Sequence, residues 1–248
     1  MTPASRASAR AAVVTGASRG LGAVLARLLA GEGFSLVLNA RDAARLERVA
    51  GELKARGSQV TVVPGDLTEP RVRERIATAV GAESGLDLLV NNAATLGPTP
   101  LPTLDAVGLA DLERVYRVNV VAPIALVQAL LPALSARRGL VINLSSDAAI
   151  GGYPGWGNYG ASKAALDLVS ATMAHELAAR GVSVVAVDPG DLKTPGAEPA
   201  FSPEEFATRP PPEVTGPFWL WLIGQPPSAV TGRRFRAQAD HWGAENVP

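Results

Sequence analysis

Short apolar runs alternate with longer amphipathic stretches along most of the chain. The apolar runs are rich in Val, Leu and Ile and predict buried strands. They cover residues 11–15, 35–39, 59–63, 86–90, 139–144 and 182–187, with a further candidate at 230–236. Stretches with a period of 3.6 residues lie between them and predict helices over residues 20–32, 42–56, 70–80, 105–136 and 158–180.

This alternation predicts a doubly wound α/β fold, in which helices cover both faces of a parallel sheet. With 248 residues, of which 47% are hydrophobic, we expect a flexible tail at residues 1–10 and one domain over residues 11–248. Residues 190–214 are dense in Pro, Glu and Thr. We expect this segment to pass over the active-site end as a substrate lid and to end in a helix that carries Trp219 and Trp221.

Composition narrows the function classes. Lys and Arg together number 23, as do Asp and Glu, and no basic stripe is present, so nucleic acid is not an expected partner. The absence of Cys excludes disulfides and a Cys nucleophile and fits a cytoplasmic protein. With only two His, no metal site is expected. No signal peptide is evident, and no run approaches the ~18 apolar residues of a membrane span, so no membrane partner is expected.

A glycine-rich loop joins the first strand to the first helix. It reads Thr15-Gly16-Ala17-Ser18-Arg19-Gly20-Leu21-Gly22. Gly16 would permit a tight turn, Gly20 would let the main chain approach a pyrophosphate, and Gly22 would let the helix pack on the strand. The helix N-terminus would add free N–H groups and a positive dipole end. An ordinary strand–helix turn is the alternative, but the strand before and the helix after it favour a dinucleotide site.

The residues after the second strand favour NADPH over NADH. A carboxylate that holds the ribose 2′-hydroxyl of NAD is usual there, but Ala40 occupies the position and Arg41 follows. Arg19 would lie nearby, and two guanidinium groups suit a 2′-phosphate. In the alternative interpretation, Arg41 only interacts with Asp42 and Glu47 of its own helix.

Two further segments follow strands at the same edge of the predicted sheet. Asp66 could bond the adenine amino group, or it could form a turn while Thr68 caps the next helix. The segment Asn91-Asn92-Ala93 follows the fourth strand at its carboxyl end, where ligand crevices form in such sheets.

Tyr159 and Lys163 form the candidate proton-transfer pair. Their spacing of four residues sets both side chains on one helix face. A nearby ammonium favours tyrosinate, and a pKa lowered by about 3 units corresponds to ~4 kcal/mol. Tyr159 would then act as general acid, while Lys163 would also donate to the nicotinamide ribose. The alternative is a core Tyr with an unrelated surface Lys.

Two more polar residues stand where chemistry would need them. Ser146 follows a strand and could hydrogen-bond the substrate oxygen, whereas its neighbour Ser145 is expected to be structural. Asn119 interrupts an apolar helix, and buried amides need partners. It could link to Lys163 through water, or it could mark a kink or be a satisfied core amide.

These motifs together resemble the short-chain dehydrogenase/reductase family. The resemblance runs from Ala11 to about Arg236 and includes the glycine loop, Asn91-Asn92-Ala93, and Asp188-Pro189-Gly190 with Thr194, which would contact the nicotinamide carboxamide. It implies a Rossmann-like sheet of about seven strands, 4-pro-S hydride transfer, and a homodimer or homotetramer joined by helices 105–136 and 158–180. The implied catalytic residues are Asn119, Ser146, Tyr159 and Lys163. The implied NADP(H)-binding residues are Gly16, Ser18, Arg19, Gly20, Leu21, Gly22, Arg41, Asp66, Leu67, Asn92, Ala93, Tyr159, Lys163, Pro189, Gly190 and Thr194.

Three positions depart from the family pattern. Ala94 replaces a usual Gly, Asp191 replaces a usual apolar residue, and residues 239–242 replace the usual closing Asp-Gly-Gly. None of the three touches the catalytic residues.

The leading hypothesis is an NADPH-dependent ketone reductase acting on a small carbonyl or secondary alcohol compound. The alternatives are an NADP(H)-binding sensor or scaffold without turnover, and an enzyme that runs toward alcohol oxidation. Tyr153 and Trp156 could line the substrate pocket, and their aromatic rings suggest a lipophilic or aromatic carbonyl compound. His175 is expected on a solvated face.

Overall fold

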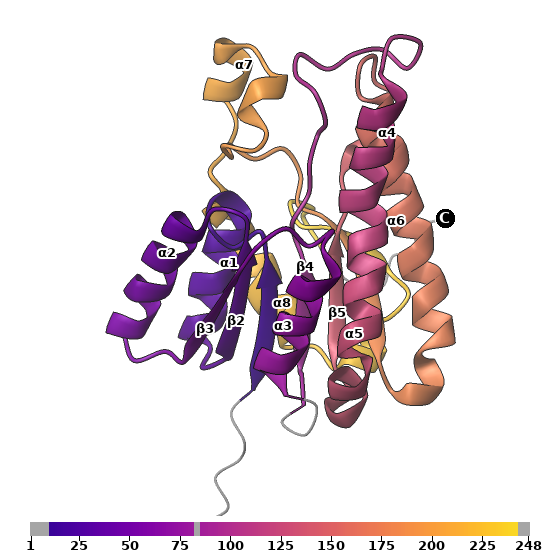
Figure 1. Cartoon of the computed structure of the whole chain (residues 1–248). Coiled ribbons are helices and arrows are strands. Elements are labelled where there is room, and N and C mark those ends of the chain that lie inside the picture. Colours follow the sequence, from indigo (N-terminus) through magenta and orange to yellow (C-terminus); the bar gives the residue numbers. More distant parts are fainter. Residues whose placement is uncertain (1–9, 82–84, 243–248) are drawn as a thin grey trace, which may run out of the picture.

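The computed structural model describes residues 10–81 and 85–242 (Figure 1). In it, seven parallel strands form one sheet in the order β3-β2-β1-β4-β5-β6-β7. The strands are β1 (Ala11–Thr15), β2 (Ser35–Ala40), β3 (Val60–Pro64), β4 (Leu88–Asn91), β5 (Leu140–Leu144), β6 (Ser183–Asp188) and β7 (Arg234–Arg236). The predicted doubly wound α/β fold is therefore confirmed, and the predicted strand at residues 230–236 shortens to three residues. The tail expected at residues 1–10 lies, except for Arg10, outside the described residues.

Helices cover both faces of the sheet, because both faces of every central strand are apolar. Ala12 and Val14 point into a core shared with α1 (Gly20–Gly31), α2 (Ala43–Ala55) and α8 (Gly216–Ile223). Val13, between them, points into a second core shared with α3 (Pro70–Val80), α5 (Ala122–Arg137) and α6 (Gly157–Glu176). The strand order reverses between β1 and β4, so the crevice expected for a ligand lies at the carboxyl ends of these strands.

The long predicted helix 105–136 is divided in the structure. It begins as α4 (Leu109–Tyr116), continues through a π-helical turn at Arg117–Val121, and ends as α5. Such π turns occur often at functional sites. The helix predicted to reach residue 180 ends at Glu176, and a 3₁₀ turn (Ala178–Arg180) follows.

The excursion at residues 190–214 contains only short elements. These are a 3₁₀ turn at Glu198–Ala200, α7 (Pro203–Ala207) and a 3₁₀ turn at Pro212–Thr215. Beyond α8 come the short α9 (Pro227–Val230) and β7. In Figure 1 α7 stands above the sheet, on the side opposite to α4, whereas α8 lies behind the sheet.

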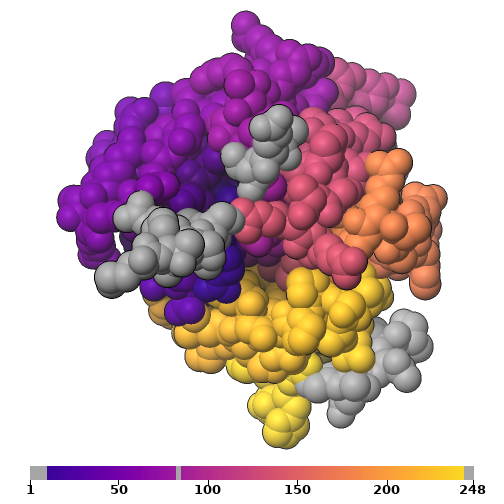
Figure 2. Space-filling model, turned by 90° about the horizontal axis from the view of Figure 1, so that it is seen from below, coloured from indigo at the N-terminus to yellow at the C-terminus, as the bar shows by residue number. Residues whose placement is uncertain are grey.

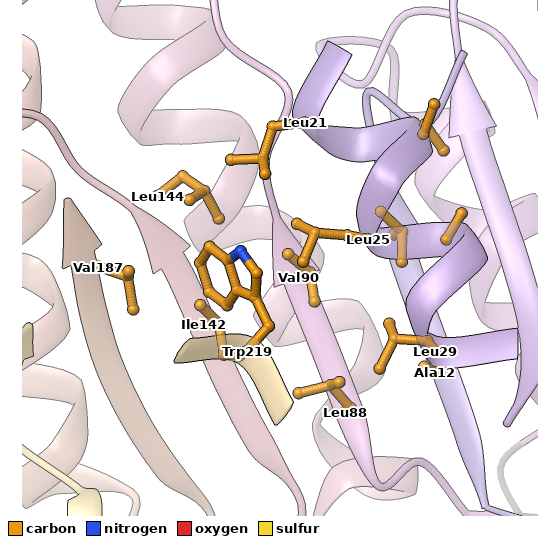
Figure 3. Packing of buried hydrophobic residues seen from close by; sticks show 14 of the residues in the cluster. Ala12, Leu21, Leu25, Leu29, Leu88, Val90, Ile142, Leu144, Val187 and Trp219 are labelled. Carbon is orange, nitrogen blue, oxygen red and sulfur yellow. The ribbon is translucent and has the colours of Figure 1, made fainter. Parts of the chain in front are cut away.

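The helix expected to carry Trp219 and Trp221 is present as α8, but Trp219 packs in the core and not in a lid. Its side chain is 1% exposed, and Figure 3 shows the indole among Leu21 and Leu25 of α1, Val90 of β4 and Ile142 of β5. The helix that follows the excursion therefore belongs to the core. Figure 2 views the molecule from below. It shows the C-terminal segments, in yellow, lying next to the N-terminal ones, in indigo.

One helical stretch in the described residues meets the length and composition of a membrane span. Leu109–Arg137 has a mean hydropathy of 1.8 over its most apolar window, and 50% of that window is buried inside the protein. The stretch is not an unbroken apolar run, since Asn119, Pro123 and Gln128 interrupt it, but average hydropathy tolerates such residues. Leu126 and Leu130 are 0% and 1% exposed and belong to the second core, which is how core helices pass the same test.

Candidate active site

The conformation of the glycine loop requires glycine at three positions. Gly16 and Gly20 have φ angles of +66° and +55°, a region that side chains disfavour. A Cβ on Gly22 would overlap the carbonyl oxygen of Gly16 and the side-chain Nδ2 of Asn92. The N-cap of α1, Arg19, makes no side-chain capping bond, so the first N–H groups of the helix can bind an anion.

Hydrogen bonds hold this loop to the end of β4. Thr15 Oγ1 accepts from the N–H groups of Asn92 and Ala93, each at 3.0 Å, and Asn92 Nδ2 donates to the Thr15 carbonyl at 2.8 Å. The predicted loop residues and the Asn-Asn-Ala segment therefore lie together. The side chains of Leu21 and Leu67 are buried in the two cores, so only their main-chain groups could face a cofactor.

Two arginines stand free at the edge of this loop. Arg19 and Arg41 are exposed, and no ion pair joins either of them to another residue in the part of the chain that is described. The alternative in which Arg41 pairs with Asp42 is not found, because Asp42 caps α2 through the Arg45 N–H and pairs with its guanidinium at 3.2 Å. Ser18 lies half-buried between Gly16 and Gly20.

Asp66 forms the turn that was the alternative to adenine binding. Its Oδ1 accepts from the N–H and the hydroxyl of Thr68, at 2.9 and 2.8 Å. Burial acts to raise the pKa of Asp66, but these bonds and the charges of Arg41 and Arg114 outweigh it and leave the pKa below its usual value. The N-cap of α3 is Glu69, so the helix cap expected at Thr68 is wrong.

Asn119 is a satisfied core amide inside the π turn, as one alternative held. It is 1% exposed. Its Oδ1 accepts from the Thr95 N–H at 2.9 Å, and its Nδ2 donates to the Thr95 carbonyl and to Ser162 Oγ at 2.9 and 3.0 Å. Asn119 therefore ties the loop after β4 to the helix that carries Tyr159.

The three other candidate catalytic residues meet where β5 ends and α6 begins. Ser146 Oγ donates to Asp147 Oδ1 at 3.0 Å, and it forms a hydrogen bond with Tyr159 that lowers the pKa of the phenol. Lys163 is 2% exposed, and its Nζ donates to the Leu144 carbonyl at 2.6 Å. The alternative of a surface Lys is excluded by this burial.

The expected lowering of the Tyr159 pKa is not found. Burial raises the pKa of Tyr159, the bond to Ser146 lowers it, and the charges of Asp188 and Asp147 raise it, so the result lies above the usual value. Lys163 Nζ lies over the Tyr159 ring, 5.5 Å from its centroid. It donates its hydrogen bond to the Leu144 carbonyl and not to the phenol oxygen. Burial lowers the pKa of Lys163 itself to about 8, against a raising effect of Asp167.

The segment after β6 covers the glycine loop. Asp188 Oδ1 accepts from the Gly190 N–H at 2.9 Å, and Gly190 has a φ of +75°. A Cβ on Gly20 would lie 3.2 Å from the Cβ of Thr194. Pro189, Gly190 and Thr194 therefore lie at the same end of the sheet as the loop, as predicted. Asp191, the departure from the family pattern, pairs with Arg209 at 3.2 Å.

Aromatic side chains surround the approach to Tyr159. Tyr153 and Trp156 line a cavity of about 250 Å³ beside the start of α6. The Trp156 ring is 5.9 Å from the Tyr159 ring and 5.5 Å from that of Phe201. The sequence analysis missed Phe201, and no local pattern marks it. His175 is exposed, as expected.

A buried amide ladder supports this end of the sheet and was also missed. Asn91 Nδ2 donates to Asn143 Oδ1, and Asn143 Nδ2 donates to Ser170 Oγ, both at 2.8 Å. A polar residue inside an apolar strand was the available signal. Within the described ranges no cluster of three His, Asp or Glu side chains could hold a metal ion.

Comparison with known proteins agrees with this geometry. The model of the short chain dehydrogenase family matches residues 10–205. A 1-deoxy-11-beta-hydroxypentalenate dehydrogenase of Streptomyces exfoliatus is 37% identical over 78% of this chain and 71% of its own. A 3-oxoacyl-[acyl-carrier-protein] reductase of a Synechocystis strain is 33% identical over 92% of this chain and 95% of its own.

Solved structures give the same result. A putative short chain dehydrogenase from Pseudomonas syringae superposes with a TM-score of 0.84 at 33% identity, covering 92% of this chain and 94% of the other. One from Shigella flexneri, solved in complex with NADP, has a TM-score of 0.84 at 30% identity and covers 93% of this chain and 97% of the other. The chain therefore belongs to the short-chain dehydrogenase/reductase family of nicotinamide-dependent oxidoreductases that act on CH–OH and C=O groups of small molecules.

Proposed function

We propose that this protein is an NADPH-dependent carbonyl reductase in which Tyr159 protonates the oxygen of a small ketone. The observation that carries the proposal is the meeting of Ser146, Tyr159 and Lys163 where β5 ends, with Lys163 buried. A chain that only bound the cofactor would have no need of a phenol beside the Ser146 hydroxyl. Desolvating an ammonium is costly, so its position here needs a function.

NADPH is favoured over NADH by charge. Arg19 and Arg41 flank the loop without ion-pair partners among the described residues, and the acidic position that would hold a ribose 2′-hydroxyl is Ala40. Two solved relatives, from Shigella flexneri and Burkholderia cenocepacia, are complexes with NADP. The free N–H groups of α1 and the space kept by Gly16 and Gly20 fit the pyrophosphate of such a cofactor.

NADPH, when bound, supplies the hydride. The protein's part is to orient the carbonyl and to move one proton. The hydroxyls of Ser146 and Tyr159 would both bond the substrate oxygen, and Tyr159 would donate its proton to it. The pKa of Tyr159 lies above its usual value, so the phenol carries the proton that it would donate. Lys163 would hold the nicotinamide ribose, and Asn119 keeps the helix of Tyr159 in register with Thr95.

The proposal extends to the oligomeric state and the cellular compartment of the enzyme. Leu109, Val121 and Leu168 are 77%, 55% and 71% exposed, and the helices that carry them lie side by side on one flank of the molecule (Figure 1). This flank would join copies into a homodimer or homotetramer. We place the enzyme in the cytoplasm, with residues 11–248 as one domain and residues 190–214 as its lid.

Purified protein tests the proposal in two steps. NADPH fluorescence should change on binding, and absorbance at the NADPH band should fall when ketones and diketones are supplied. Binding without loss of NADPH on any carbonyl compound would favour the alternative of an NADP(H) sensor or scaffold. Faster turnover of alcohols with NADP⁺ than of ketones with NADPH, at equal pH, would reverse the proposed direction.

A further inference from the structure

Arg234, on the last strand, reaches from β7 to the candidate catalytic serine. Its side chain is 13% exposed. The guanidinium Nε donates to Asp167 Oδ2 of α6 at 2.8 Å, and one terminal nitrogen donates to the main-chain carbonyl of Ser146 at 2.8 Å. The same nitrogen lies 3.6 Å from Asp188 Oδ2 at the end of β6. One cation thus joins three elements around the site.

Each partner of Arg234 acts on a different candidate catalytic group. Ser146 is itself one of them. Asp167, four residues beyond Lys163 and therefore on the same helix face, raises the pKa of that lysine. Asp188 raises the pKa of Tyr159. Arg234 therefore offsets part of the charge of the two carboxylates that influence the lysine and the phenol, and it holds the main chain of the serine.

Attachment of the last strand does not require this side chain. β7 pairs with β6 through its main chain, the Val184 N–H donates to Thr231 Oγ1 at 3.1 Å, and Gln238 Nε2 donates to the Pro189 carbonyl at 3.0 Å. A buried arginine with two carboxylates costs desolvation that a packed apolar side chain would avoid. A purely structural role gives little reason for it.

We propose that Arg234 is a positioning residue for catalysis, which holds the Ser146 segment in place and balances Asp167 and Asp188 beside Lys163 and Tyr159. The proposal rests on the proposed function, since it assigns Arg234 to the same reaction. It predicts that losing the guanidinium slows the chemical step, while cofactor binding at the glycine loop stays as it is.

The test compares Arg234→Gln and Arg234→Lys with the matched control Arg233→Gln. Arg233 precedes the strand and carries the same charge, and its side chain forms no hydrogen bond or ion pair with another described residue. Arg234→Gln should lower kcat by roughly 10- to 100-fold, as misplacing catalytic groups by about 1 Å does, with the Kd for NADPH changed less than about threefold. Arg234→Lys should recover part of kcat, because the ammonium still faces Asp167.

A second measurement does not depend on turnover. In the cofactor-free protein, amide hydrogen exchange of residues 146–149 should speed up in Arg234→Gln and stay at the wild-type rate in Arg233→Gln. Equal kcat in Arg234→Gln and wild type, or exchange that speeds up evenly over the whole protein, would overturn the proposal. If Arg234→Gln does not fold, Arg234→Lys decides: a wild-type kcat overturns the proposal and a lowered kcat supports it. If wild type consumes no NADPH with any carbonyl compound, the proposed function fails, and exchange still tests the positioning of Ser146.

Discussion

The glycine loop and the catalytic centre lie at the same edge of the sheet but are built in opposite ways. The loop depends on main chain and on the absence of side chains: Gly16, Gly20 and Gly22 leave room, and the free N–H groups of α1 would bind an anion. The catalytic centre depends on buried charges, with Lys163, Asp188 and Arg234 all largely removed from water. The first kind of site is encoded locally, whereas the second depends on residues far apart in the sequence.

This difference predicts that loss of the proton donor lowers turnover far more than it lowers cofactor affinity. The largest effect is expected for Tyr159→Phe, which removes the proton donor. Loss of general acid catalysis costs about 10²- to 10⁴-fold in kcat, whereas the Kd for NADPH should hold within a few-fold. Tyr116→Phe is the control, since four residues after Tyr116 stands Val120 and no lysine. Ketone turnover that survives Tyr159→Phe would remove the phenol from the mechanism.

The buried lysine should also be visible in stability against pH. The pKa of Lys163 is about 8, below its ordinary value of 10.5, so between these values the unfolded chain binds more protons than the folded one. The free energy of unfolding should therefore rise with pH across this window, by about 2 to 3 kcal/mol relative to Lys163→Met. Urea unfolding of both proteins, at pH values from roughly 7.5 to 10.5, measures this rise. A constant difference between the two would show that folding leaves the pKa of Lys163 unchanged.

Changes at the glycine loop should weaken the binding of NADPH more than they slow the chemical step. A Cβ on Gly22 overlaps the Gly16 carbonyl, and such overpacking costs about 1 to 3 kcal/mol. Gly22→Ala should therefore raise the Kd for NADPH roughly tenfold or more. Gly51→Ala on α2 is the matched control, because nothing lies within 4 Å of its added Cβ. Equal NADPH affinities for the two variants would mean that Gly22 is not needed for space.

The last effect concerns the choice between the two nicotinamide cofactors. Arg41→Asp should reduce the preference for NADPH over NADH by about ten- to a hundredfold, since one charge-assisted contact is worth about 1.5 to 3 kcal/mol. The ratio of kcat/KM for the two cofactors measures it. Arg48→Asp, an exposed change on α2, serves as control and should leave the ratio unaltered. A preference unaffected by Arg41→Asp would take the 2′-phosphate away from this arginine.

The sequence predicted the locally encoded features correctly and failed where distant residues decide. The strands, the glycine loop and the places of Ser146, Tyr159 and Lys163 follow from local patterns, because strand ends and helix spacing fix where these side chains emerge. The lowered pKa expected for Tyr159 failed, because it was drawn from Lys163 alone. Burial and the charges of Asp147 and Asp188 act on the phenol, and Asp188 arrives from a strand that lies 29 positions downstream.

Two further results were out of reach for the same reason. Trp219 was assigned to a lid, but the core formed by α1 and the sheet has an apolar space that its indole fills (Figure 3). Arg234 stands in a three-residue strand whose local pattern gives no sign that it contacts Ser146. Tertiary contacts decide both positions, and neither propensity nor periodicity contains them.

Isotope transfer tests the central claim most directly. Wild-type protein would be supplied with NADPH carrying deuterium at the 4-pro-S position and with the ketone that it turns over best. The account predicts deuterium on the new carbinol carbon of the alcohol product, with unlabelled NADP⁺ left behind. Alcohol without deuterium, or NADP⁺ that retains it, would contradict transfer from that face of the nicotinamide to the carbonyl beside Tyr159.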